Sequence, residues 1–161
     1  MRTDNGKVRG IIVSIYFLLI VLAIVLATVF GAFSELSDDP AFTFSVIFVT
    51  FVAILLLVYI NSKYFEYDSD GIKVVVINRG LLLGDKLNYR EKRLEFYKRN
   101  LVGFKIRNYV FYKMLKLVVK HSDGKTRKHV FNVTLVKKRK RNYMKKSLRK
   151  ILRENTKNTE A

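Results

Sequence analysis

The chain has 161 residues, of which 50% are hydrophobic, and a formal net charge of +18. This length gives room for one modest domain with accessory segments rather than for several domains. Because the chain has no cysteine, a disulfide framework and a Cys-based metal site are both excluded.

Two long runs without a charged residue hold much of the hydrophobic content, at residues 11–33 and 41–60. At a rise of 1.5 Å per residue, a helix over either run can span a hydrocarbon layer of ~30 Å. A buried helix of a soluble protein usually has only about 10–14 apolar residues, and a cleaved signal peptide has an apolar core of about 7–15. We therefore predict two transmembrane helices, of which the first is retained, joined by a short external loop at residues 34–40.

A few small or weakly polar residues interrupt these runs and are candidates for close packing between helices. They are Thr28, Gly31 and Ala32 in the first run and Ser45 in the second. The alternative is that these residues face lipid and have no role.

The distribution of charge predicts how the chain is oriented in the membrane. Residues 1–10 contain three Lys or Arg and one Asp, residues 31–40 contain three acidic residues and no Lys or Arg, and residues 61–161 contain 28 Lys or Arg and nine acidic residues. Since Lys and Arg near the ends of spans stay on the cytoplasmic side, both termini are expected there. The acidic loop should lie outside, with Pro40 in the first turn of the second helix and Ser37, Asp38 or Asp39 as its cap.

After residue 60 the continuous apolar pattern gives way to short runs separated by turn signals. Strands are expected near residues 63–68 and 72–79, within "GLLLGDKL" at 80–87, and in the alternating segments "RLEFYK" and "LVGFKIR". Leu94 and Phe96 should share one face of the first of these two segments. Val102, Phe104 and Ile106 should share one face of the second.

A β-hairpin is expected around "KMLKLVVKHSDGKTRKHVFNVTLV". A two-residue turn at Asp123-Gly124 would set Phe131 opposite Lys116 and separate the apolar faces. A three-residue turn, Ser122-Asp123-Gly124, pairs Leu115 with Phe131 and aligns the apolar side chains, including Val133 and Leu135. We therefore predict the three-residue turn, with a bulge and Gly124 in the left-handed conformation.

The last element is predicted to be an amphipathic helix over about 139–154, within a basic domain at residues 61–154. Its apolar side recurs at helical spacing, through Met144, Leu148, Ile151 and Leu152. The polar residues 155–161 are expected to form a disordered tail, and residues 1–10 a basic cytoplasmic tail.

About seven strands followed by a closing helix, with the turn "YDSDGI" near the start, resemble the pleckstrin-homology (PH) superfold. The whole layout resembles bacterial membrane proteins that carry a PH-like domain after a transmembrane hairpin. The resemblance implies an α+β membrane protein with a small antiparallel β domain. Phosphoinositide-binding members carry basic residues around the first hairpin loop, whereas residues 68–71 here are acidic, and fold alone does not establish function.

No pattern in the sequence points to catalysis. There is no phosphate-binding glycine loop and no credible nucleophile with its base. His121 and His129 lie on one predicted hairpin but not directly opposite each other, so a metal site is not expected. We expect a non-enzymatic protein without a cofactor.

The strongest remaining signal is a cationic surface on the terminal segment. It comprises Lys137, Lys138, Arg139, Lys140, Arg141, Lys145, Lys146, Arg149 and Lys150. A plain solvated surface that also determines topology is one interpretation. Contact with the anionic lipids of the inner leaflet is a second, since each Lys or Arg near such a surface contributes about 1 kcal/mol.

RNA or ribosome binding near a translocation site is a third interpretation, because aromatic residues suited to base stacking are interleaved with the cations. These aromatic residues are Tyr89, Phe96, Tyr97, Tyr109, Phe111, Tyr112 and Tyr143. The function that the sequence favours is a membrane-anchored scaffold, an accessory subunit of a larger membrane complex, with the RNA tether as the alternative.

Overall fold

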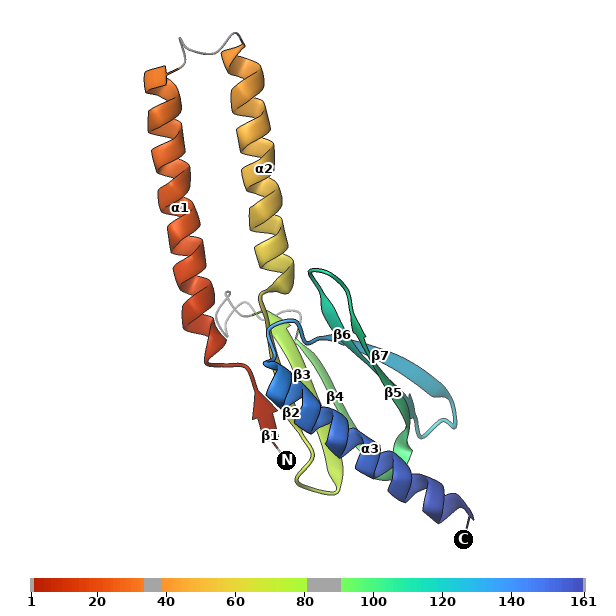
Figure 1. Ribbon diagram of the computed structural model, residues 1–161. Helices are drawn as coiled ribbons and strands as arrows, with labels where there is room; N and C mark the ends of the chain where they lie inside the picture. Colours follow the sequence, from red (N-terminus) through yellow and green to blue (C-terminus); the bar gives the residue numbers. More distant parts are fainter. Residues whose placement is uncertain (1, 34–38, 81–90, 161) are drawn as a thin grey trace. The chain divides into compact units, whose positions relative to one another are not determined.

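A computed structural model describes residues 2–33, 39–80 and 91–160, which divide into two compact units. One unit is a helical hairpin over residues 7–62 (Figure 1). The other, here called the β domain, combines the described residues of 1–6 and 63–161.

The hairpin consists of α1 (Val8–Phe33) and α2 (Pro40–Asn61), which cover the two predicted apolar runs. Asp39 caps α2: its Oδ1 accepts a hydrogen bond from the Phe42 N–H at 3.0 Å, and Pro40 occupies the first turn, as predicted. Both helices have the length and composition needed to cross a membrane.

Hydroxyl groups within these helices bond to their own backbone. Ser14 donates to the carbonyl of Gly10 at 3.0 Å, and Thr50 donates to the carbonyl of Val46 at 2.8 Å. These bonds satisfy the hydroxyls without a partner from outside the helix, which an apolar surrounding requires.

The β domain contains two antiparallel sheets and a C-terminal helix, α3 (Lys138–Glu160). The four-stranded sheet has the order β1 (Arg2–Asp4), β2 (Lys63–Asp68), β3 (Lys73–Gly80), β4 (Lys92–Tyr97). A 3₁₀ turn, Lys98–Asn100, leads to the three-stranded sheet, of order β5 (Leu101–Asn108), β6 (Lys113–Lys120), β7 (Thr126–Asn132). The described residues are therefore α+β, as expected, with seven strands, of which β1 was not expected.

One hydrophobic core joins both sheets to α3. The largest fully buried side chains come from all three layers: Phe65, Tyr67, Leu115, Leu117, Phe131, Met144 and Leu148. Leu94 and Phe96 are buried together, and Met144, Leu148 and Ile151 face the sheets, so the predicted inner faces of β4 and α3 are confirmed.

The hairpin of β6 and β7 also has the predicted register. Leu115 pairs with Phe131, and the N–H of His121 donates to the carbonyl of Lys125 at 2.9 Å, leaving a three-residue turn. Gly124 has φ of +75°, the left-handed conformation in which a side chain would be strained.

Several details of the prediction are wrong. Val102 does not share a face with Phe104, because a bulge shifts the register between Leu101 and Gly103; Leu101 is buried instead and Val102 is exposed. Strand β7 ends at Asn132, so Leu135 lies half-buried in the turn that leads to α3.

The predicted disordered tail is also wrong, because α3 continues to Glu160. The amide of Asn155 donates to the carbonyls of Lys98, at 2.8 Å, and Leu101, at 3.0 Å, and so fixes this part of the helix to the 3₁₀ turn. The strand predicted over 80–87 falls almost entirely outside the described residues.

The N-terminal strand β1 was not predicted at all, since residues 1–10 were expected to form a tail. Thr3 pairs with Tyr67, and both Thr3 and Asn5 are buried. The side chain of Asn5 extends the ladder: its amide donates to the carbonyl of Lys63 at 2.9 Å and its oxygen accepts from the N–H of Phe65 at 2.8 Å. The chain thus contributes to the β domain both before and after the helical hairpin.

Candidate functional site

Hydrogen bonds between the sheets show which turns of the β domain share an end. Strand β2 begins at Lys63, and the antiparallel register puts the last residues of β3 beside it. There, the amide of Asn78 donates to the carbonyl of Asn132 at 3.1 Å, and Lys92 donates to the carbonyl of Val130 at 2.9 Å. The end of β7 therefore meets the start of β2.

The turn between β5 and β6 lies at this same end. Asn132 pairs with Met114 of β6, and Met114 pairs with Arg107 of β5, so residues 109–112 follow directly. Figure 1 shows this turn and the turn between β2 and β3 at opposite ends of the β domain. The end of the β domain that carries the turn between β5 and β6 is here called the anchor end. The chain passes at this end from Gly6 to α1 and from α2 to Lys63.

The basic cluster at residues 137–141 also lies at the anchor end. Lys140 donates a hydrogen bond to the carbonyl of Asp4, the last residue of β1. Arg139 donates to the hydroxyl of Tyr143 at 3.0 Å and lies over its ring, and this bond lowers the pKa of the Tyr143 phenol. Lys137, Lys138 and Arg139 are exposed.

The remaining predicted cations are spread along α3. Lys146 and Lys150 line a groove of about 470 Å³ together with Lys98, Ser69 and Ser147. Lys150 also lies 3.9 Å from Glu154, a weak exposed ion pair. Lys145 and Arg149 are exposed and do not line this groove.

The anchor end also carries an exposed apolar turn. In this turn Tyr109 is 48% exposed, Val110 88% and Phe111 69%. The N–H of Tyr109 donates to the carbonyl of Tyr112 at 2.7 Å and closes the turn. The sequence signal was present in "NYVFYK", where consecutive apolar residues interrupt the strand alternation.

The aromatic residues considered for base stacking do not form one surface. Phe96 is part of the core, whereas Tyr97 is exposed between the side chains of Lys73 and Arg99, at 5.1 and 5.3 Å from its ring centre. Tyr109 and Phe111 lie at the anchor end, and Tyr143 on α3. Tyr89 lies outside the described residues.

The structure brings the side chains of His121 and His129 together, although the two residues are not directly opposite, as predicted. His129 pairs with Leu117, not with His121, yet the two Nε2 atoms are 3.2 Å apart because the side chains reach along the hairpin. Partial burial, followed by the charges of His121, Lys92 and Arg127, lowers the pKa of His129. Within the described residues, no third His, Cys, Asp or Glu completes a metal-binding group.

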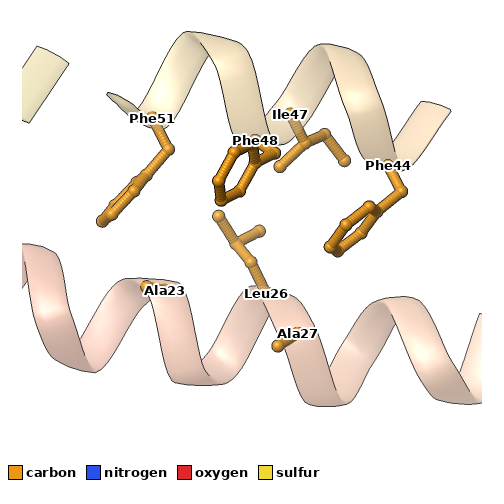
Figure 2. A pocket seen from close by; sticks show the side chains of 7 residues that line it. All are labelled: Ala23, Leu26, Ala27, Phe44, Ile47, Phe48 and Phe51. Atoms are coloured by element: carbon orange, nitrogen blue, oxygen red, sulfur yellow. The ribbon is translucent and has the colours of Figure 1, made fainter. Parts of the chain in front are cut away.

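The helical hairpin has its own cavity, of about 130 Å³, between α1 and α2. Figure 2 shows Phe44, Phe48 and Phe51 of α2 pointing toward α1, where Ala23 and Ala27 leave room for them. Small residues four apart are a common helix-packing pattern in membranes.

Two of the residues predicted for helix packing, Thr28 and Ser45, do not line this cavity. Thr28 and Ser45 are exposed and bond to the carbonyls of Val25 and Ala41, each at 2.8 Å. The side chains of Gly31 and Ala32 lie outside the described part of α1.

Comparisons of the chain with protein-family models, with curated proteins and with solved structures found no match.

Proposed function

We propose that this chain is a two-span membrane protein that acts by binding, with a basic PH-like β domain on the cytoplasmic side of a bacterial inner membrane. The observation that carries the proposal is the apolar surface of the helical hairpin. Phe17 and Leu18 of α1 and Phe42 and Val49 of α2 are among many large side chains exposed along both helices. Exposure of so large an apolar surface to water is energetically unfavourable, so lipid or other membrane helices must cover it.

The charges of the anchor end support the proposed orientation. Lys137, Lys138 and Arg139 are exposed where the chain connects to both helices, and an anionic inner leaflet attracts cations placed there. The two sheets of four and three strands with a C-terminal helix support the PH-like interpretation.

The proposed role is that of an accessory subunit or scaffold. The hairpin packs beside the helices of a larger membrane complex, and the β domain holds a protein partner near the anionic leaflet. The β domain has two polar surfaces that this partner could contact. One is the groove beside Lys98, Lys146 and Lys150, and the other is formed by the exposed cations of α3.

The test is purification of the tagged full-length protein in mild detergent at low and high salt, with mass spectrometry of the proteins that accompany it. The proposal predicts a fixed set of membrane proteins that stays bound at high salt, because contacts between apolar helices are not screened by ions. The variant Lys137→Gln/Lys138→Gln/Arg139→Gln should retain the same set.

A matched control is Lys120→Gln/Lys125→Gln/Lys128→Gln, which removes the same charge from exposed positions on the β6–β7 hairpin. Recovery of ribosomal proteins at low salt, lost at high salt and lost selectively in the first variant, would instead establish the RNA tether.

A further inference from the structure

The turn at residues 109–111 exposes large apolar side chains, which is unusual for a turn that faces water. Val110 and Phe111 are more exposed than most other apolar side chains of the β domain, although they lie next to each other at the tip of a well-formed hairpin. Exposing adjacent large apolar groups costs free energy unless something covers them.

Basic residues precede and follow this apolar tip on the two strands of the hairpin. Arg107 and Lys105 are exposed on β5 below it, and Lys113 follows it on β6. The ring of Tyr112 is partly buried and lies 6.5 Å from that of Tyr109, which supports the turn from one side. A segment that carries apolar side chains at its tip and basic side chains next to them binds favourably at the boundary between lipid headgroups and acyl chains.

The position of the turn points to the same surface. It lies at the anchor end, where Asn5 is hydrogen-bonded to Lys63 and Phe65 and where both connections to the helical hairpin leave the β domain. A bilayer crossed by α1 and α2 must begin close to these connections, because β2 starts two residues after α2 ends.

We propose that Tyr109, Val110 and Phe111 insert into the interface of the bilayer that α1 and α2 cross. The tip then acts as a third attachment, which fixes the orientation of the β domain on the membrane, while Lys105 and Arg107 contact anionic headgroups. This inference rests on the membrane anchorage of the proposed function.

The absence of tryptophan from the chain allows a direct test. The variant Phe111→Trp places a single fluorescent reporter at the tip of the full-length protein, reconstituted in vesicles of phosphatidylethanolamine and phosphatidylglycerol. A matched control is Ile72→Trp, because Ile72 is 79% exposed and lies in the turn at the opposite end of the β domain.

We expect the emission of the Phe111→Trp protein to shift to shorter wavelength and to lose intensity when part of the lipid is brominated on its acyl chains. The Ile72→Trp emission should stay that of a water-exposed indole. Adding Val110→Asp to the first variant should reduce the quenching, without unfolding the domain, because residue 110 is solvent-exposed in the fold.

Equal emission from both reporters, with or without brominated lipid, would overturn the proposal. A blue-shifted Phe111→Trp emission that brominated lipid does not quench would also overturn it, because the tip would then be covered by protein. Extraction of the same preparations with alkaline carbonate distinguishes a failure of the membrane anchorage from a failure of the insertion. Release of the protein from the vesicles would contradict the anchorage itself. Retention of the protein without quenching would contradict only the insertion of the turn.

Discussion

The close approach of His121 and His129 gives the β6–β7 hairpin a group that responds to pH. One ring nitrogen must donate and the other accept across their 3.2 Å separation, so the pair is formed best when at least one ring is neutral. Burial and neighbouring cations lower the pKa of His129, and the native state therefore binds its proton less readily than the unfolded chain does.

We predict that stability contributed at this site is complete above the ordinary histidine pKa of about 6.5 and falls as pH decreases from there toward the lowered native value. The two histidines are the only ones in the chain, so NMR titration of the full-length protein can follow both. His129 should titrate at lower pH than an ordinary histidine. In His121→Gln its pKa should rise only in part, because burial remains the largest cause; a midpoint at or above the ordinary value in the unaltered protein would contradict the prediction.

At the scale of elements, the N-terminal strand β1 adds the fourth strand to its sheet by pairing with β2. Replacing Asn5 by Ala removes two hydrogen bonds and leaves the buried N–H of Phe65 without its acceptor. An unsatisfied buried donor costs about 1–3 kcal/mol, so Asn5→Ala should lower the free energy of unfolding by that amount. Amide exchange at Phe65 should become faster.

The control for this prediction is Arg2→Ala, on the same strand. Arg2 makes an exposed ion pair with Glu66 at 2.8 Å, and such pairs contribute little. If Arg2→Ala destabilised the domain as much as Asn5→Ala does, the amide of Asn5 would not be the group that holds β1.

Elements with a local pattern could be predicted from the sequence, and elements that depend on distant partners could not. Alternating apolar residues indicated β4 and the register of β6 and β7, and helical spacing indicated the buried side of α3. Strand β1 has only three residues and pairs with residues more than sixty positions away, so it leaves no periodic signal. The last turns of α3 are polar, and their attachment through Asn155 depends on the distant 3₁₀ turn.

The candidate site was predictable in part for the same reason. The basic residues at 137–141 were evident as a run of charge, but their place at the anchor end follows from the bond between Lys140 and Asp4. The run of apolar residues at 109–112 interrupts the strand alternation, but whether these side chains are buried or exposed depends on the folded structure.

At the scale of the whole molecule, the β domain is assembled from residues that precede and residues that follow the helical hairpin in the sequence. Residues 2–5 reach β2 only if the connection before α1 and the one after α2 are on the same side of any membrane that the helices cross. The pairing of β1 with β2 therefore agrees with an even number of spans, as the charge distribution also predicts.

Labelling with a membrane-impermeant maleimide tests whether α1 and α2 span a membrane with the β domain in the cytoplasm. Because the chain has no cysteine, Ser37→Cys in the acidic loop and Ile72→Cys in the β domain each give one reactive thiol. In spheroplasts of a bacterial host, we predict that the Ser37→Cys protein is labelled at once and the Ile72→Cys protein only after lysis. Labelling of Ile72→Cys in intact spheroplasts, with protection of Ser37→Cys, would contradict the orientation, and equal labelling of both would contradict the two spans.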